Sequence, residues 1–339
     1  MIKTGIIGLG KMGISHCSIV NAHPLAKVVA VCDTSSFVLE AFKKYTGIAT
    51  FTDYRKMIDT AGLECVFIAT PTKFHAELVN YALSAGLHTF CEKPFVLHSE
   101  DGEKLVELAK QKKLVGQVGY HNRFIATFNE CRRLVAQKVM GDIFHFNAET
   151  YGPVVVRPQS GTWRSRREEG GGCLYDYTSH TLDLIKFIIG APVKARGTLL
   201  KSIYSKNVDD AVYATLYLEN GLSGQLSVNW SDASYRKISV QITIIGTKGK
   251  IFSDAQEVKI YLKEENGSEG LKKGWNTRYI TELQKPVAFF LRGEEYSSQI
   301  DYFIRQVNEK NMENINSFEN ALWTDHVIEL LKKDAADGG

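Results

Sequence analysis

The sequence predicts an N-terminal α/β domain with a doubly wound parallel sheet, followed by an α+β domain with an antiparallel or mixed sheet. Three observations support this prediction. Strand-like and helix-like segments alternate through residues 1–122, strands joined by short turns dominate from Asp142 onward, and 339 residues are too many for one ordinary core. We therefore predict domains at 1–122 and 123–339, and expect the C-terminal helix to pack back on the first domain.

The first domain follows from its alternating pattern, because buried strands separated by helices form parallel sheets. Apolar runs of strand length occupy residues 2–7, 27–33, 48–51, 64–69, 87–91 and 114–118. Helix-like segments occupy residues 37–45, 54–59, 74–85 and 99–112, and another follows Gly13. Ligands of such sheets bind at the carboxyl ends of the strands, so the residues directly after each strand are site candidates.

The second domain has few helices between its strands. Predicted strands occupy residues 142–151, 193–203, 211–218, 223–229, 237–245, 250–253 and 258–262. Asn220-Gly221 and Thr247-Lys248-Gly249 are typical of hairpin turns, which favour antiparallel pairing. Helices are expected at residues 124–140, 299–307 and 318–331.

A glycine motif follows the first strand, with the residues Gly8, Gly10, Lys11, Met12 and Gly13 as candidate contacts. This spacing between a strand and a helix suits a dinucleotide, because its pyrophosphate can approach Gly10 and the helix N-terminus. Asp33 lies twenty residues after Gly13, where a carboxylate can bind the adenine-ribose hydroxyls and repel the 2′-phosphate of NADP. NAD is therefore the expected cofactor, with a helix cap or turn as the alternative role of Asp33.

Composition excludes several other classes of protein. The net charge is only +3 and no Lys/Arg block occurs, so nucleic acid and membranes are not expected partners. No apolar run reaches the ~18–20 residues of a membrane span, and a strand begins at residue 2, so we expect a cytoplasmic protein without a signal peptide. The six cysteines form no CxxC pair, which favours reduced buried thiols and no metal site.

Two segments carry residue types suited to proton transfer. Glu92-Lys93-Pro94 follows the fifth strand, where Lys93 can stabilise an alkoxide and Pro94 can take a cis bond. Three glycines, 170–172, precede a helix on which Asp176 and His180 are four residues apart and share one face. A carboxylate beside an imidazole is the arrangement of a general base with an orienting partner, although exposed helices also carry such pairs.

Other candidates flank these segments. Thr70, Pro71, Thr72 and His75 follow the fourth strand and are predicted, with Glu92 and Lys93, to contact the cofactor, while Thr72 also suits a helix N-cap. Tyr120, Asn122 and Arg123 follow the sixth strand and are predicted to line the substrate side. The long loop 152–172 contains Trp163 and Arg164, which suit a polyhydroxylated or phosphorylated ligand, or else a solvated charged surface.

These motifs together resemble the Gfo/Idh/MocA family of sugar and inositol oxidoreductases. The resemblance rests on Gly8–Gly13, Ala69-Thr70-Pro71 with His75, Glu92-Lys93-Pro94, and the triple glycine followed by Asp176 and His180. It implies a Rossmann domain, then an α+β domain with an open, largely antiparallel sheet that commonly forms a dimer or tetramer interface. It also implies that His180 takes the hydroxyl proton, Lys93 polarises the oxygen and Asp176 supports them. Thr178 stands where relatives often have Gly or Ala.

The predicted function is NAD-dependent hydride transfer between nicotinamide and a secondary alcohol or ketone of a sugar, inositol or sugar derivative. Three alternatives stay open at this point. One is a nucleotide-sugar 3-dehydrogenase or ketoreductase, motivated by the arginines between Arg157 and Arg167. Another retains NAD tightly for an internal oxidoreduction, and the last is a non-catalytic sensor that binds NAD.

Overall fold

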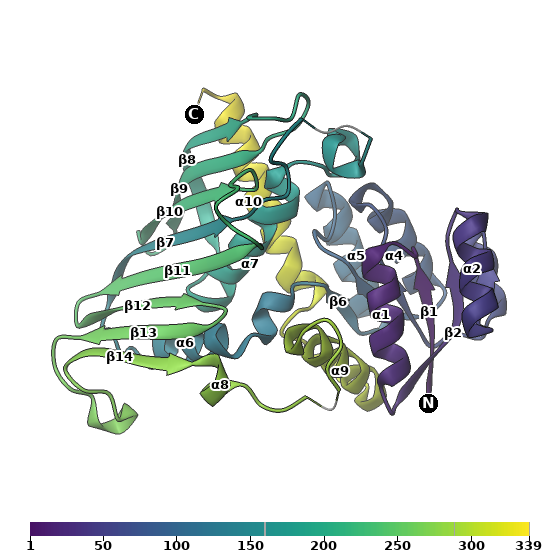
Figure 1. Cartoon of the computed structure of the whole chain (residues 1–339), viewed down its shortest axis with the longest axis horizontal. Helices are drawn as coiled ribbons and strands as arrows, with labels where there is room; N and C mark the ends of the chain where they lie inside the picture. The colour runs from purple at the N-terminus through teal and green to yellow at the C-terminus, as the bar shows by residue number, and fades with distance from the viewer. Residues whose placement is uncertain (159–160, 288, 339) are drawn as a thin grey trace. The chain divides into compact units, whose positions relative to one another are not determined.

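The computed structural model describes residues 1–158, 161–287 and 289–338 (Figure 1). The chain forms two compact units. The first contains Met1–His121 and Pro286–Leu322, and the second contains Asn122–Lys285 and Trp323–Gly339. Residues 286–322 thus belong to the first unit, although the sequence pattern predicts them in the second domain. The division into folding domains at residue 122 stays a prediction.

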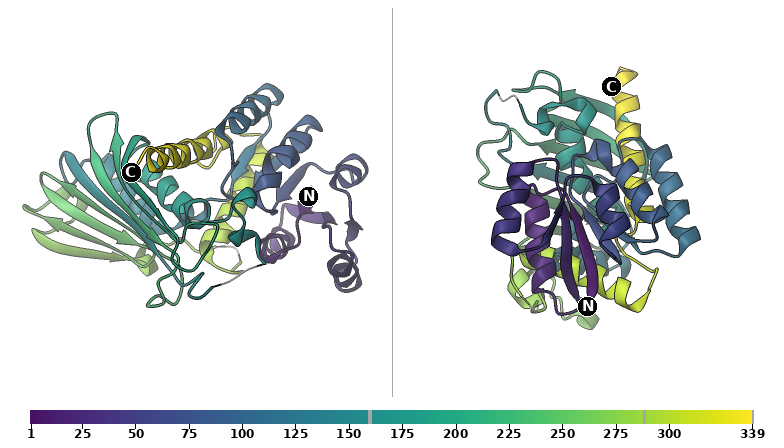
Figure 2. Two further views of the ribbon diagram at one scale, coloured as in Figure 1. Left: turned by 90° about the horizontal axis from the view of Figure 1, so that it is seen from above. Right: turned by 90° about the vertical axis from the view of Figure 1, so that its right-hand side faces the viewer.

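A parallel sheet of six strands forms the centre of the first unit, in the order β3-β2-β1-β4-β5-β6. Its strands are β1 (Ile2–Ile7), β2 (Ala26–Cys32), β3 (Ala49–Phe51), β4 (Cys65–Ile68), β5 (His88–Cys91) and β6 (Gly116–Val118). Its helices are α1 (Lys11–Ala22), α2 (Ser36–Thr46), α3 (Tyr54–Thr60), α4 (His75–Ser84), α5 (Ser99–Lys112) and α9 (Glu294–Glu309). The helices lie on both sides of the strands (Figure 2, right), so the predicted doubly wound sheet is confirmed.

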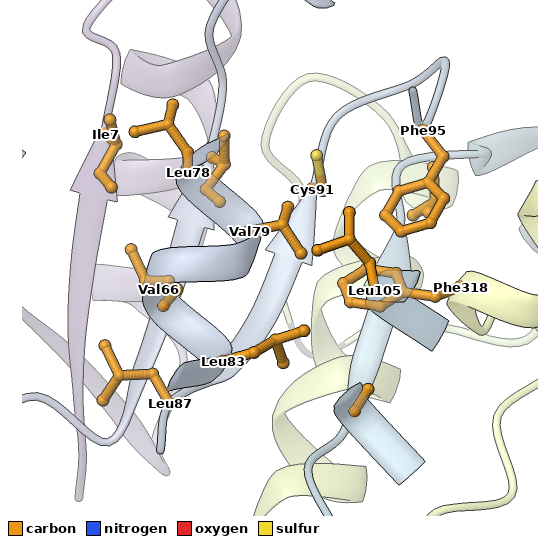
Figure 3. Packing of buried hydrophobic residues seen from close by; sticks show 14 of the residues in the cluster. Ile7, Val66, Leu78, Val79, Leu83, Leu87, Cys91, Phe95, Leu105 and Phe318 are labelled. Atoms are coloured by element: carbon orange, nitrogen blue, oxygen red, sulfur yellow. The ribbon is translucent and has the colours of Figure 1, made fainter. Parts of the chain in front are cut away.

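Each face of this sheet packs a separate core, because successive side chains of a strand point to opposite faces. Ile6 packs with Phe67, Phe90 and side chains of α1 and α9. Ile7 packs on the other face with side chains of α4 and α5 and with Phe318 (Figure 3). The core reaches the last residue of several strands, such as Ile7 and Cys91, and the candidate residues of this unit follow directly after them.

The returning segment 286–322 also covers the edge strand β6. Val118 N–H donates to the Asn316 carbonyl at 3.0 Å, and Asn316 Nδ2 donates to the Val118 carbonyl at 2.7 Å. Asn314 Nδ2 donates to Gln117 Oε1 at 3.0 Å. An edge strand covered in this way cannot pair with another chain.

The second unit contains a sheet of eight strands in the order β14-β13-β12-β11-β7-β10-β9-β8. The strands are β7 (Ile143–Tyr151), β8 (Pro192–Lys201), β9 (Ala211–Leu218), β10 (Ser223–Asn229), β11 (Ser239–Gly246), β12 (Gly249–Asp254), β13 (Glu257–Leu262) and β14 (Gly274–Tyr279). Within the described part of this unit, β7 and β10 are the one pair of neighbouring strands that run parallel, so the predicted open, largely antiparallel sheet is confirmed.

One face of this second sheet is covered by helices (Figures 1 and 2, left). They include α6 (Ala126–Ala136), α7 (Ser179–Ile188) and the later turns of α10 (Phe318–Ala336), while the short α8 (Ile280–Leu283) follows β14. Buried residues alternate with partly exposed ones along β7, β9 and β11, which leaves the opposite face accessible. Among the residues that the structure describes, no helix has both the length and the apolarity of a membrane span.

Candidate active site

The glycine turn after β1 is shaped by contacts at two of its three glycines. Gly8 has φ +92°, and a Cβ there would lie 2.5 Å from the Ala69 carbonyl oxygen. A Cβ on Gly13 would lie 1.7 Å from the Gly8 carbonyl oxygen, so α1 packs directly on the turn. A Cβ on Gly10 would meet nothing within 4 Å. Space beside Gly10 is therefore open, as a pyrophosphate bound at the start of α1 requires.

The first turn of α1 presents backbone N–H groups without an acidic side chain to cap them. Gly10 is the N-cap residue and makes no side-chain cap, and Lys11 and Met12 begin the helix. The partial positive charge of this helix end can therefore act on a phosphate.

Asp33 lies at the end of β2, beside the glycine turn. Leu9 N–H donates to its Oδ2 at 2.7 Å, and Ser35 N–H donates to its Oδ1 at 2.9 Å. The cap of α2 is Ser35, whose side chain accepts from Val38 N–H, so Asp33 is not the helix cap. Two backbone donors orient the carboxylate and leave lone pairs on both oxygens for ribose hydroxyls.

His75 connects the turns that follow β4 and β5. Its side chain is fully buried, with Nδ1 2.9 Å from the Pro94 carbonyl oxygen and Nε2 3.0 Å from the Thr70 carbonyl oxygen. Burial lowers the pKa of His75 below its usual value. This geometry favours a role in holding the two turns rather than in touching the cofactor.

Thr70, Pro71 and Thr72 lie where predicted, directly after β4. The helix-cap alternative for Thr72 is wrong, because Pro71 is the N-cap residue of the 3₁₀ turn η1 (Thr72–Phe74) and Phe74 is that of α4. Contact of these three residues with the cofactor stays a prediction.

Glu92, Lys93 and Pro94 follow β5, and the Lys93–Pro94 bond is cis. Lys93 is partly exposed, whereas the Glu92 carboxylate turns inward to His16, with Nε2 and Oε1 2.6 Å apart. Burial raises the pKa of Glu92, but the hydrogen bond from His16 and the charge of Lys93 outweigh it and leave that pKa below its usual value. The carboxylate is therefore ionised at neutral pH.

Tyr120 and His121 follow β6 in the same unit. Tyr120 is fully buried. The His121 ring stacks on Tyr296, with centroids 4.6 Å apart, and burial lowers the pKa of His121 to about 4. His121 is therefore neutral at physiological pH.

Arg123 in the second unit was predicted to bind substrate together with Asn122. Its Nε and Nη2 donate to the two carboxylate oxygens of Asp183 at 2.9 and 2.6 Å. Both side chains of this ion pair are buried, with 3% and 0% exposed, and Asn122 is buried as well. The pair joins the start of the second unit to α7, which favours a structural role for Arg123.

The triple glycine lets the chain pass close to an acidic side chain of the same unit. Gly172 has φ +107°, and a Cβ there would lie 2.7 Å from Asp209 Oδ1. Leu174 N–H donates to Asp209 Oδ2 at 2.6 Å. A π-helical turn, η5 (Leu174–Thr178), then leads into α7. Such turns often occur at functional sites, and the sequence carries no local signal for this one.

Asp176 and His180 lie on η5 and the start of α7, and both are buried. Arg164 Nε donates to Asp176 Oδ2 at 2.9 Å, and the Arg164 guanidinium lies 4.7 Å from the centre of the Trp163 ring. The structure thus connects Trp163, Arg164 and Asp176. Residues 159–160 of the same loop lie outside the described residues.

Two residues that contact these motifs, His16 and Asp209, were not predicted from the sequence. Neither carried a motif, since His16 lies within a helix and Asp209 in a polar connection. All six cysteines are buried and carry free thiols. No three His, Cys, Asp or Glu side chains gather as metal ligands in the described ranges 1–158, 161–287 and 289–338.

The doubly wound sheet, the glycine turn and Asp33 define a dinucleotide-binding protein of the Rossmann class. The chain belongs to the Gfo/Idh/MocA family of oxidoreductases. Residues 2–120 match the model described as "Oxidoreductase family, NAD-binding Rossmann fold", and residues 128–252 match the GFO/IDH/MocA C-terminal domain. The protein is therefore an NAD-dependent oxidoreductase, and the open space at Gly10 fits that cofactor.

Sequence similarity to dehydrogenases of named activity extends over most of the chain. It is 26% identical to scyllo-inositol 2-dehydrogenase (NAD(+)) of Bacillus subtilis, over 74% of this chain and 73% of that protein. It is also 26% identical to myo-inositol 2-dehydrogenase of Thermotoga maritima, over 90% and 88%. The structure of levoglucosan dehydrogenase with NADH is similar, with a TM-score of 0.88, 22% identity, and 99% and 97% of the two chains covered.

Proposed function

We propose that this enzyme oxidises a secondary alcohol of a sugar, inositol or sugar derivative, or reduces the corresponding ketone. The observation that carries the proposal is the buried pair of side chains, Asp176 and His180, on a π-helical turn that leads into α7. A carboxylate and an imidazole one helical turn apart suit removal of a hydroxyl proton. The inositol and levoglucosan dehydrogenases named above support this substrate class.

The proposed roles follow from the chemistry of each side chain. NAD supplies the acceptor for the hydride that leaves the carbinol carbon. His180 takes the hydroxyl proton as the C=O bond forms, and Lys93 donates a hydrogen bond to the oxygen as negative charge develops on it. Asp176, held by Arg164, supports His180, while Trp163 and Arg164 offer a face for the remaining hydroxyls.

The test is NADH formation from scyllo-inositol, myo-inositol and levoglucosan by wild type and His180→Ala. Loss of a general base should reduce kcat by about 10²–10⁴-fold. His326→Ala is the matched control, since His326 lies on α10 in the second unit and is partly exposed. Equal rates of wild type and His180→Ala, or an equal loss in His326→Ala, would contradict the role of His180 as general base.

A nucleotide sugar is the alternative substrate. This alternative rests on Arg164 and the neighbouring arginines, which could bind a diphosphate. Arg166 Nη1 lies 3.1 Å from Glu169 Oε1, and Arg167 Nε donates to the Asn207 carbonyl at 3.3 Å. These contacts occupy the groups that would meet a diphosphate, so we favour the uncharged polyol. Tighter binding of UDP-glucose to wild type than to Arg166→Ala would reverse this preference. The non-catalytic sensor is not retained, because the family is one of oxidoreductases.

We also propose that the partly exposed face of the eight-stranded sheet joins subunits into a dimer or tetramer in the cytoplasm. Near the centre of the sheet, the partly exposed side chains of β7 and β11 on this face include the uncharged Asn147 and Thr243. Light scattering after gel filtration would give the mass. A monomer at micromolar concentration would contradict this assembly.

A further inference from the structure

Helix α1 contains one buried histidine, His16, and ends at a second, its C-cap residue His23, and each meets a carboxylate of its own unit. His16 Nε2 lies 2.6 Å from Glu92 Oε1, and His23 Nε2 lies 3.0 Å from Asp301 Oδ1. His16 is fully buried and lies against the rings of Phe67 and Phe90, with centroids 5.7 and 5.2 Å away. The proposed hydride transfer uses neither histidine.

The carboxylate that His16 holds is also bound to the backbone of the proposed catalytic lysine. Lys93 N–H donates to Glu92 Oε2 at 3.2 Å, and Glu92 N–H donates to the Ile68 carbonyl at 2.9 Å. Glycine at position 119 leaves room for this carboxylate, since a Cβ there would lie 3.0 Å from Glu92 Oε2. One side chain thus connects the helix of the glycine turn to the main chain of Lys93.

The surroundings of the pair limit which hydrogen bonds the His16 ring can make. His16 Nδ1 is buried and has no hydrogen-bond partner within the described part of the chain. With a proton on Nε2, the ring donates to Glu92 and places no N–H on the unpartnered Nδ1. The pair thereby gives the Lys93 amide a held acceptor, the Glu92 carboxylate.

We propose that His16 is a positioning residue for Lys93. By holding the Glu92 carboxylate, His16 fixes the Lys93 amide and hence the direction in which the lysine side chain leaves the end of β5. The inference rests on the proposed function of Lys93. The hydrogen bonds that connect His16, Glu92 and the Lys93 amide are independent of that function.

The first test is hydrogen exchange of the Lys93 amide in the NAD-free protein. His16→Ala should make this amide exchange at least about tenfold faster, because its acceptor is no longer held. His16→Gln, which keeps a donor, should restore most of the protection. His23→Ala is the matched control, since it removes a similar pair at the C-cap of α1 and should leave the Lys93 amide protected. Wild-type protection in His16→Ala, or an equal loss in His23→Ala, would overturn the proposal.

The second test is kinetic, with the polyol that wild type oxidises fastest. Misplacement of Lys93 should lower kcat of His16→Ala about 100-fold, while the Kd for NADH and the KM for the polyol change less than about threefold. His23→Ala should lose thermal stability but keep kcat. If Lys93→Ala is inactive and His16→Ala is fully active, only the positioning role fails. If Lys93→Ala is fully active, the proposed function itself fails.

Discussion

Replacing Gly10 by alanine should weaken NAD binding without unfolding the protein. Gly10 has φ −68° and ψ −175°, a conformation open to alanine, and its Cβ would meet nothing within 4 Å. Alanine is a poorer N-cap than glycine, which lowers stability, but it also makes the unfolded chain less flexible, which raises stability. The free energy of unfolding should therefore change by less than about 1 kcal/mol. The methyl group would instead occupy the space proposed for the pyrophosphate.

The size of the effect follows from the hydrogen bond that the methyl group would break. Displacing the phosphate from one backbone N–H removes a charge-assisted hydrogen bond worth about 1.5–3 kcal/mol, which raises the Kd for NADH about 10- to 100-fold. Titration calorimetry with NADH measures this change, and urea unfolding measures stability. Gly13→Ala is the contrasting variant, because its Cβ would lie 1.7 Å from the Gly8 carbonyl oxygen and must displace α1.

Two results would refute this reasoning. Gly10→Ala binding NADH as tightly as wild type would show that the pyrophosphate does not approach Gly10. A loss of stability in Gly10→Ala as large as that in Gly13→Ala would show that the open space beside Gly10 does not exist in solution.

Other predictions concern charged groups. Asp33→Ser should raise the Kd for NAD about tenfold. It should also reduce the preference of the enzyme for NAD over NADP, since no carboxylate would then repel a 2′-phosphate. An unchanged ratio of the Kd values for NAD and NADP would contradict this role of Asp33. Arg123→Ala should cost about 3–5 kcal/mol in urea unfolding, because Asp183 would stay buried without its partner, and Arg123→Leu combined with Asp183→Leu should recover part of the loss. His121 has a folded pKa of about 4, below its usual 6.5, so its unfolded form binds more protons between these values. Stability should therefore fall on the order of 2 kcal/mol as pH drops from 6.5 to 4, and His121→Phe should show a shallower decline; a parallel decline would exclude His121 as the cause.

Most of the strands could be predicted because their signals are local. β1 matches its apolar run at residues 2–7, and β4 and β5 lie within the predicted runs. β14 was missed, because it is an edge strand whose side chains are all partly or fully exposed, so no alternation of buried and exposed residues marks it. Strand order also needs contacts between distant segments, which no local pattern encodes.

The residues of the candidate site likewise include some that local sequence signals predict and some whose roles those signals do not determine. The glycine turn and Asp33 could be predicted, because backbone conformation and the length of one strand–helix–strand unit determine their spacing. Membership in an NAD-binding oxidoreductase family confirms that cofactor. The roles of Lys93, Asp176 and His180 stay proposals that these motifs and the family suggest.

By itself, the sequence determined the fold class, the cofactor and the segments that carry proton-transfer groups, since each depends on residues close together in the chain. Only the tertiary structure decided which partners hold those groups. His16 meets Glu92 across 76 residues of sequence, and Arg123 meets Asp183 across 60. Such pairs exist because buried charged and polar groups must find partners wherever the fold brings chain segments together.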